Sequence, residues 1–295
     1  MDRDLLAHLP VVRRVAERRS FARAAAELGL SPSAVSHAVR LFEERLRTPL
    51  FTRTTRSVSL TEAGQTFLAA AIPALDALEE AASMIQAADG NVTGTVRINA
   101  PSVAMPLALT RIIARLAGRH PRLVVEVTSD EALVDIVRAG HDMGVRLGEM
   151  IAQDMVAVRL TPPFKAIMAA SPEYLRLRGK PRALADLKTH NCIGFRQLSG
   201  GGVYAWDLAD EGKDVAVKVS GSVRVTEPLL AIELASQSVG IAYGFEPLMR
   251  DAIQAGRLEQ VLPAASIEEP GLFLYFPRRA TQAPKIRAFV DAVRA

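Results

Sequence analysis

Residues 20–46 constrain this chain more than any other stretch, because they predict two short helices separated by only three residues. Ser20 and Ser31 each stand where a side-chain oxygen can cap the first turn of a helix. Gly29 stands where the first helix must end, and Pro32 opens the second, where its missing N–H costs nothing. Two helices joined this tightly cannot lie side by side along their length. The second must therefore cross the first steeply and project from it.

Each predicted helix has an apolar side and a polar side. We expect the apolar sides to form a small interior, in which alanines allow the helices to approach closely. These apolar residues are Ala24, Ala25, Leu28, Leu30, Val35, Val39 and Leu46. The outward face of the second helix carries hydroxyls, an imidazole and a guanidinium, groups that suit base edges and phosphates. These polar residues are Ser33, Ser36, His37 and Arg40.

The net positive charge of the chain lies entirely on the segment that contains these helices. Residues 1–66 hold 11 arginines, no lysine and 7 acidic residues, a net charge of +4, which equals the formal net charge of the whole chain. The remaining 25 basic and 25 acidic residues cancel. A basic segment on a neutral body is typical of nucleic-acid-binding proteins, although a solvated basic face explains the charge equally well on its own.

Further elements flank the two helices. Residues 2–19 have apolar side chains at helical spacing and predict a first helix. Residues 48–64 are rich in Thr, Ser and Arg and predict a small hairpin or extended wing. The residues expected near its tip are Arg53, Thr54, Thr55 and Arg56.

A long helix is predicted after the wing. Thr61 can cap it, and Glu62 lies at its positive end. Its apolar residues recur in steps of three and four, which is the pattern of a seam between two long helices. They are Leu68, Ala71, Leu75, Leu78, Ala82 and Ile85. We favour pairing with a second copy of the chain, through Leu68, Leu75, Leu78 and Ile85, over packing on the helix's own chain.

After a small, polar stretch at residues 87–94, the chain alternates between strands and helices. The predicted strands are 95–100, 123–128, 143–147, 164–171, 240–243 and 271–277, and residues 211–213 form a turn between two more. The predicted helices are 103–117, 130–139, 227–238 and 284–293. Strand–helix–strand alternation with short connections predicts parallel sheet with helices on both faces, and a second α/β unit begins near Thr161.

Several protein classes are disfavoured. The chain is 49% hydrophobic, so it can bury large cores, yet no apolar run is long enough to span a bilayer. The N-terminus carries acids at positions 2 and 4, which is unlike a signal peptide. A single cysteine, Cys192, excludes an intrachain disulfide and is typical of the reducing cytoplasm; we favour a buried inert thiol over a redox sensor. The histidines lack metal-ligand spacing, and no phosphate-binding or nucleophile motif occurs, so an enzyme is disfavoured.

One set of residues matches a known pattern. It comprises Ser20-Phe21, Ala24-Ala25, Leu28, Ser31, Ser33-Ala34-Val35-Ser36, Glu43, Leu46, Leu50-Phe51, Arg53, Arg56 and Leu60-Thr61-x-Ala63-Gly64. In these residues, and in the later phrases DMGVRLG, CIGFR and SVGIAYGFE, the chain resembles the LysR-type transcriptional regulators. Two positions depart from that family. Pro32 replaces a common Gln that can read a base, and Arg47 replaces a common Gly just after the second helix.

The resemblance implies a fold of class α plus α/β. It comprises a winged helix-turn-helix DNA-binding domain (1–60), a linker and dimerisation helix (61–91) and an effector-binding domain resembling periplasmic binding proteins (92–295). The latter would have one subdomain formed by about 92–160 and 268–295 and a second formed by about 161–267. The resemblance also implies dimers, usually tetramers, and DNA contacts from Ser31, Pro32, Ser33, Ser36, His37, Arg40, Arg53, Thr54 and Arg56.

An effector pocket is expected at the carboxyl ends of the predicted strands, near helix N-termini that favour anions. The expected lining residues are Pro101, Ser102, Thr128, Ser129, Arg146 and Thr226. Arg146 is the natural partner of an effector carboxylate, and its alternative role is a structural ion pair with Glu149 or Asp142. Ser102 and Ser129 could equally be helix caps.

We therefore interpret the chain as a cytoplasmic, nucleoid-associated and homo-oligomeric regulator of transcription. It would bind double-stranded DNA and RNA polymerase, contact no membrane, and require no metal or cofactor other than a small, anionic effector of unknown identity. The alternative is an α/β small-molecule-binding protein or enzyme whose N-terminal segment only oligomerises it.

Overall fold

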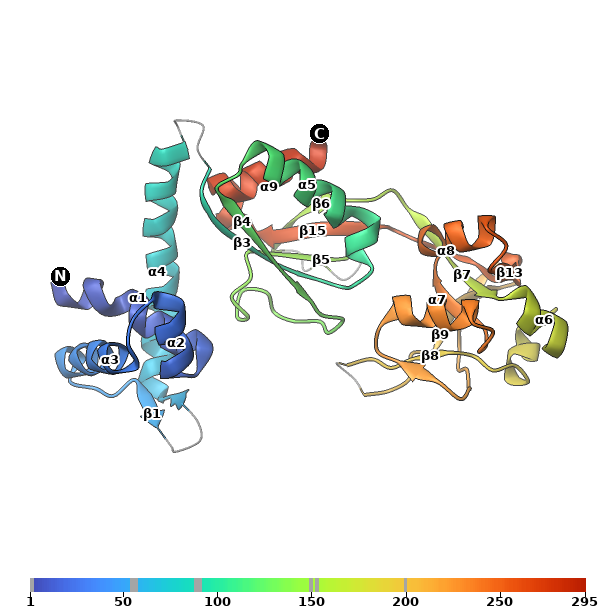
Figure 1. The fold of residues 1–295 in the computed structure, drawn as a ribbon, viewed down its shortest axis with the longest axis horizontal. Helices are drawn as coiled ribbons and strands as arrows, with labels where there is room; N and C mark the ends of the chain where they lie inside the picture. Colours follow the sequence, from blue (N-terminus) through green and yellow to red (C-terminus); the bar gives the residue numbers. More distant parts are fainter. Residues whose placement is uncertain (1–2, 54–57, 88–91, 149–150, 152–153, 199–200) are drawn as a thin grey trace. The chain divides into compact units, whose positions relative to one another are not determined.

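A computed structural model describes residues 3–53, 58–87, 92–148, 151, 154–198 and 201–295. The chain forms two compact units, Met1–Ile85 and Gln86–Ala295 (Figure 1). The first unit contains helices and one hairpin, and the second contains the remaining strands and helices. Within the described parts of the chain, no helix is long and apolar enough to cross a membrane.

The N-terminal unit packs three helices around one apolar core and adds a hairpin and a long helix. Its elements are α1 (Arg3–Arg18), α2 (Phe21–Leu28), α3 (Pro32–Leu46), β1 (Phe51–Arg53), β2 (Val58–Leu60) and α4 (Glu62–Ala87). The buried core consists of Leu9, Val12, Val15, Ala24, Ala25, Val35, Val39, Phe42, Leu50, Phe51 and Leu68.

The predicted pair of helices is confirmed, together with the local interactions that define its ends. The Ser20 hydroxyl accepts a hydrogen bond from the backbone N–H of Arg23, and the Ser31 hydroxyl accepts one from Ala34. Gly29 ends α2 in the left-handed conformation, with φ 65°. One predicted core residue was wrong: Leu30 is 45% exposed, because it lies in the short connection between the helices rather than on either apolar side.

Arg47 shows what the departure from glycine does at the end of α3. It adopts the left-handed conformation, with φ 51°, and its N–H donates to the Glu44 carbonyl oxygen. This conformation costs a residue with a Cβ atom about 1 kcal/mol relative to glycine. The helix therefore ends in the geometry that a glycine would favour, with a cationic side chain at the position.

Side chains of α3 and α4 hold the start of the hairpin in place. One carboxylate oxygen of Glu43, Oε1, accepts hydrogen bonds from the backbone N–H groups of Leu50 and Phe51, at 2.7 and 3.0 Å. The Thr61 hydroxyl caps α4 by accepting from the Gly64 N–H and donates to the Pro49 carbonyl oxygen. Gly64 is required there, because a Cβ atom would lie 2.2 Å from the Leu50 carbonyl oxygen.

The predicted pairing seam of α4 divides into two parts. Leu68 is only 2% exposed and belongs to the core of its own unit, against which Leu75 also packs. Leu78 and Ile85 are 59% and 77% exposed. The prediction of Leu68 as a dimerisation residue is therefore wrong, since the beginning of the helix buries its apolar side on its own chain.

The first sheet of the second unit has five strands in the order β4-β3-β5-β15-β6. They are β3 (Gly94–Ala100), β4 (Leu123–Ser129), β5 (Met143–Leu147), β6 (Met155–Arg159) and β15 (Leu272–Pro277). β3 runs parallel to β4 and β5, whereas β15 is antiparallel to both of its neighbours. The predicted parallel pairing is confirmed for β3, β4 and β5 but is wrong for β15, a strand from the end of the chain that enters this sheet in the opposite direction.

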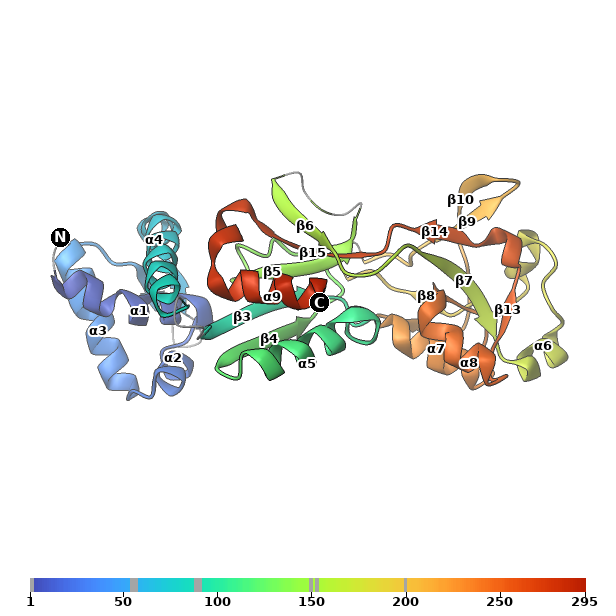
Figure 2. The same ribbon diagram turned by 90° about the horizontal axis from the view of Figure 1, so that it is seen from above.

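Two helices cover the first sheet. A π-helical turn (Met105–Leu109) leads into α5 (Thr110–Arg119), and α9 (Pro284–Arg294) lies beside α5 (Figure 2). Their apolar residues pack against Val96, Ile98 and Ala100 of β3. The helix predicted at residues 130–139 is absent. Residues 130–135 are irregular and residues 136–140 form a turn, at whose start the Asp135 carboxylate accepts from two nearby backbone N–H groups and so competes with a helical backbone.

The second sheet centres on β7 (Phe164–Ala170), to which three strands pair in antiparallel orientation. They are β12 (Ala242–Phe245), β13 (Glu259–Val261) and β14 (Ile267–Glu269). Smaller pairs are β9 (Trp206–Asp210) with β10 (Lys213–Val217), and β8 (Gly194–Phe195) with β11 (Arg224–Val225). The helices are α6 (Pro172–Arg178), α7 (Pro228–Ser236) and α8 (Glu246–Gln254), with 3-10 turns at Leu184–Lys188 and Pro263–Ala265. A further 3-10 turn, Arg278–Gln282, follows β15 and packs against β15 and α9 at the first sheet.

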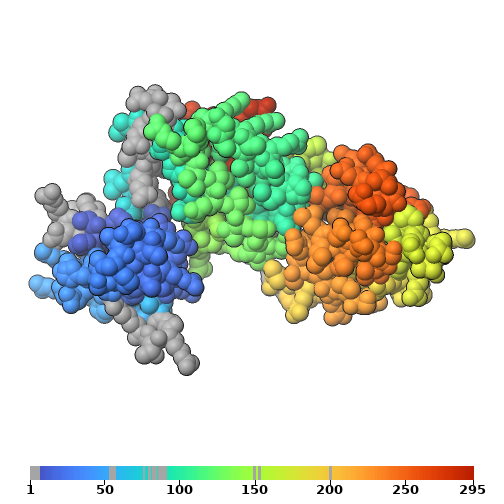
Figure 3. Space-filling view, in the orientation of Figure 1, coloured from blue at the N-terminus to red at the C-terminus, as the bar shows by residue number. Residues whose placement is uncertain are grey.

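Both faces of β7 are buried, which explains its nearly continuous apolar sequence. Ile167 and Ala169 face the cluster that contains α7 and α8, while Met168 faces Trp206 and Cys192. The outer side of α7 lies on the surface (Figure 3). Cys192 is buried, as the sequence favoured, and burial raises the pKa of its thiol to about 12, which disfavours the reactive thiolate.

Candidate nucleic-acid interface and ligand pocket

The outward side chains of α3 line one open hollow. Ser33, Ser36, His37 and Arg40 recur at helical spacing and therefore share a face, and with Glu43 they surround a space of about 420 Å³. The sequence predicted the first four. The apolar positions Val35 and Val39 fix this orientation, because they are fully buried in the core behind the helix.

Hydrogen bonds arrange the polar groups along this face. A terminal nitrogen of Arg40 lies 3.0 Å from Nδ1 of His37, and its Nε lies 3.7 Å from a carboxylate oxygen of Glu44. The hydroxyls of Ser31 and Ser33 are 2.9 Å apart. The surface thus presents hydroxyl, imidazole and guanidinium groups together, and Arg40 remains largely exposed to an incoming ligand.

The predicted wing exists as a hairpin, in which Phe51 pairs with Leu60 and Arg53 with Val58. The side chain of Arg53, and the whole of Thr54, Thr55 and Arg56, lie outside the described residues. Their predicted contacts with DNA therefore stay predictions.

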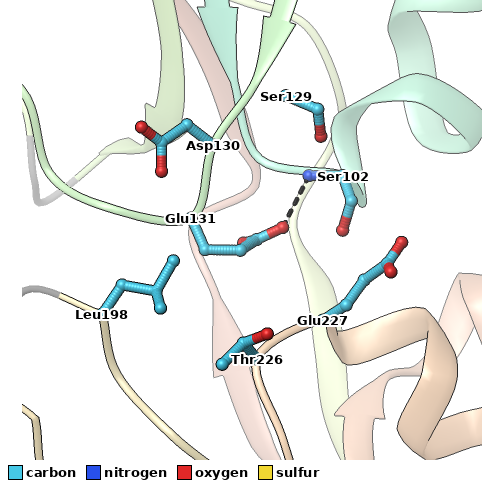
Figure 4. Close-up of a pocket in the computed structure, with 7 residues that line it drawn as sticks. All are labelled: Ser102, Ser129, Asp130, Glu131, Leu198, Thr226 and Glu227. Atoms are coloured by element: carbon cyan, nitrogen blue, oxygen red, sulfur yellow. Dashed lines mark hydrogen bonds between the residues drawn. The ribbon is translucent and has the colours of Figure 1, made fainter.

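A pocket of about 240 Å³ lies in the second unit, at the carboxyl ends of β3 and β4 and the start of α7 (Figure 4). Three predicted residues line it: Ser102, Ser129 and Thr226. The sequence reasoning missed the other lining residues, Asp130, Glu131, Leu198 and Glu227. Three of these are acidic: Asp130 and Glu227 directly follow the predicted residues Ser129 and Thr226, and Glu131 lies two positions after Ser129, so proximity in the chain was the available signal.

Three predicted residues do not line this pocket: Pro101, Thr128 and Arg146. Thr128 precedes Ser129 along β4, so alternation directs its side chain to the opposite face of the sheet. Pro101 is half-buried and immediately precedes the lining residue Ser102 in the chain.

Arg146 is only 4% exposed, and its guanidinium donates to three neutral oxygens, those of the Val145 and Ala132 carbonyls and of the Asn99 amide, each at 2.6 Å. Burial lowers the pKa of Arg146, although a guanidinium stays charged. The alternative role in an ion pair with Asp142 is also wrong, because Asp142 instead pairs with Lys285 at 2.7 Å. Glu149 lies outside the described residues. Arg146 supports the wall of the site rather than presenting its charge to a ligand.

The polar groups of the pocket are only partly satisfied by the protein. Glu131 Oε1 accepts from the Ser102 N–H at 2.8 Å, and Asp130 Oδ1 accepts from the Ala132 N–H at 2.9 Å. Glu227 precedes α7 but does not cap it through its side chain. The Ser102 hydroxyl is buried and has no hydrogen-bond partner among the described residues.

Two models of known protein families match this chain, one over each of its two structural units. The model of the bacterial regulatory helix-turn-helix protein, lysR family, matches residues 6–65, and that of the LysR substrate binding domain matches residues 89–295. These two segments contain the α3 surface and the acidic pocket, respectively.

Similar proteins extend over the whole chain. The uncharacterized HTH-type transcriptional regulator YcaN of Escherichia coli is 39% identical over 95% of this chain and 91% of its own length. The HTH-type transcriptional regulator PgrR of Escherichia coli is 33% identical, covering 100% and 98%. Among solved structures, the LysR-type transcriptional regulator CrgA of Neisseria meningitidis has a TM-score of 0.62 at 25% identity, covering 100% and 98%. This chain therefore belongs to the LysR family of transcriptional regulators, which bind DNA through a helix-turn-helix and are not enzymes.

Proposed function

We propose that α3 enters the major groove of an operator and reads its sequence. Ser33, Ser36 and His37 meet base edges, while Arg40 and the helix start at Ser31 and Pro32 lie against the backbone. The observation that carries this proposal is the gathering of exposed donors and acceptors on one face of a helix whose other face is buried. The wing residues Arg53, Thr54 and Arg56 add contacts to phosphates or the minor groove.

Two chains pair through the exposed part of α4. Leu78 and Ile85 are large apolar residues that this unit leaves uncovered, and a partner helix would bury them. Such a dimer, or a tetramer of two dimers, places two α3 helices on one duplex, so the operator has two-fold symmetry. The protein acts in the cytoplasm, associated with the nucleoid.

A small effector in the 240 Å³ pocket controls the regulator. The effector domain extends over residues 92–295, in the two subdomains given above. Binding there shifts the balance between oligomer shapes, and thereby DNA bending and recruitment of RNA polymerase, by no more than the effector's differential affinity for those shapes. The anionic effector expected from the sequence loses its support, since Arg146 does not line the pocket whereas three acidic residues do.

The test is a footprint and binding titration on DNA upstream of the protein's own gene, at several salt concentrations with competitor DNA. His37→Ala should reduce discrimination between operator and competitor by about 1–3 kcal/mol. Arg40→Ala should instead weaken binding to every DNA sequence. It should also reduce the slope of the logarithm of the binding constant against the logarithm of the salt concentration by about 1. Arg119→Ala removes the same charge from an exposed site in the second unit and serves as the matched control.

Two results would contradict the proposed role of α3. One is an unchanged footprint and unchanged discrimination in the double variant His37→Ala, Arg40→Ala. The other is an equal loss of affinity in Arg119→Ala and Arg40→Ala, which would mean that only the net charge of the chain matters.

A further inference from the structure

The lining of the pocket has a strong charge bias. Its ionisable residues are Asp130, Glu131 and Glu227, and no lysine, arginine or histidine lines it among the residues that the structure describes. Arg146 lies behind the wall and interacts electrostatically with Glu131 and Asp130, but its hydrogen bonds are taken by neutral oxygens. A ligand entering this space therefore meets an excess of negative charge.

Two of these carboxylates face the same point. Glu131 and Glu227 extend into the space beside Ser102, whereas the Asp130 carboxylate points away from it (Figure 4). Glu131 accepts from the Ser102 N–H through Oε1, and its Oε2 accepts no hydrogen bond from the residues that the structure describes. The Glu227 carboxylate accepts no hydrogen bond from the described residues. Two open carboxylate positions thus remain, one on either side of the pocket.

Ser102 supplies a second, independent indication that a ligand belongs here. The residue is only 9% exposed, and its hydroxyl points into the pocket without a hydrogen-bond partner among the described residues (Figure 4). An unsatisfied buried hydroxyl is destabilising, so its presence calls for a ligand group that completes it. The hydroxyl and the two carboxylates line the same pocket, and all three can accept hydrogen bonds from a ligand there.

The chemistry of these acceptors distinguishes among cations. An ammonium group has three N–H donors, which matches one carboxylate oxygen from each glutamate and the serine hydroxyl. A divalent metal ion prefers six or more oxygen ligands, and no metal-binding group of acidic, histidine or cysteine side chains occurs in the described residues. Leu198 adds an apolar patch to the lining, and the 240 Å³ space accommodates only a small molecule.

We infer that the effector of this regulator is a small primary amine with a short aliphatic part, whose ammonium binds Glu131, Glu227 and Ser102. This inference rests on the proposed function, because it names the class of effector for the same pocket. It replaces an anionic effector with a cationic one.

The test uses the full-length protein and ligand-detected NMR titrations with butylammonium, butyrate, butanol and Ca²⁺. Butylammonium should bind at least about tenfold more tightly than the isosteric butyrate. Glu131→Gln and Glu227→Gln should each weaken butylammonium binding about tenfold, and Ser102→Ala about threefold. Glu268→Gln, which removes the same charge from an exposed position on β14, should leave binding unchanged.

Four outcomes would overturn the inference: tighter binding of butyrate, binding of Ca²⁺ alone, equal weakening by Glu268→Gln, or binding of none of the probes at millimolar concentration. The footprint of the same preparation separates this failure from failure of the proposed function. Specific DNA binding without an amine site would overturn only the effector class. An amine site without specific DNA binding would overturn the role of α3.

Discussion

Replacing Glu43 should loosen the junction between α3 and the wing, because a single carboxylate oxygen holds two backbone groups there. Glu43 Oε1 accepts from the N–H groups of Leu50 and Phe51, and both of these residues are buried. Glu43→Ala leaves both donors without their acceptor. A hydrogen bond to a charged group contributes about 1.5–3 kcal/mol, and partial exposure of Glu43 allows water to replace part of this.

We therefore expect Glu43→Ala to lower the free energy of unfolding of the N-terminal unit by about 2–3 kcal/mol, and Glu43→Gln, which keeps a carbonyl oxygen, by about 1 kcal/mol. Glu44→Ala is the adjacent control. Glu44 is exposed and lies 3.7 Å from Arg40, so its loss should change stability by no more than about 0.5 kcal/mol.

Amide hydrogen exchange on the full-length protein, measured residue by residue during a urea titration, is the suitable assay. The amides of Leu50 and Phe51 should lose protection in Glu43→Ala and keep it in Glu44→Ala. Retained protection at both amides, together with an unchanged exchange free energy for α3, would refute the reasoning.

Three further predictions concern packing, pairing and reactivity. Gly64→Ala should destabilise the N-terminal unit by about 1–3 kcal/mol in thermal melting, because its Cβ would clash with the Leu50 carbonyl oxygen. The control Gly118→Ala, in open space on α5, should be neutral or stabilising. Equal shifts of the melting temperature in the two variants would contradict this prediction. Leu78→Asp should reduce the mass of the oligomer measured by light scattering without unfolding the protein, whereas Leu68→Asp should unfold the N-terminal unit. A Leu78→Asp variant that stays fully dimeric would exclude pairing through the exposed part of α4. Cys192, whose thiol stays protonated below its pKa of about 12, should resist alkylation at pH 8 until urea unfolds the protein; rapid labelling of the native protein would show that the thiol is accessible.

The parts of the structure that the sequence predicted well depend on interactions between near neighbours in the chain. Ser20 and Ser31 cap helices through N–H groups three residues away, and Gly29 supplies a backbone conformation by itself. The outward face of α3 follows from helical periodicity once Val35 and Val39 are assigned to the core. Which side chains α3 turns outward could therefore be predicted residue by residue, whereas their contacts with DNA stay a proposal.

The parts that the sequence did not predict depend on partners distant in the chain. Periodicity alone could not show that Leu68 packs on its own unit while Leu78 stays exposed, because both choices bury an apolar side. It could not show that β15 runs antiparallel to β5 and so makes the first sheet mixed, although the family resemblance groups residues 268–295 with 92–160.

The candidate effector site likewise has features that follow from local sequence and features that depend on distant parts of the chain. The sequence by itself determined that Ser102, Ser129 and Thr226 lie at or just beyond the ends of strands, since this is a local property of each segment. Only the tertiary structure decided that Arg146 turns to neutral oxygens inside the wall while Glu131 and Glu227 face Ser102. The charge that a pocket presents is a sum over side chains from different segments. The charge of the pocket therefore depends on which of these side chains are buried and which are hydrogen-bonded. Residue spacing along one segment determines neither the burial nor the hydrogen bonding.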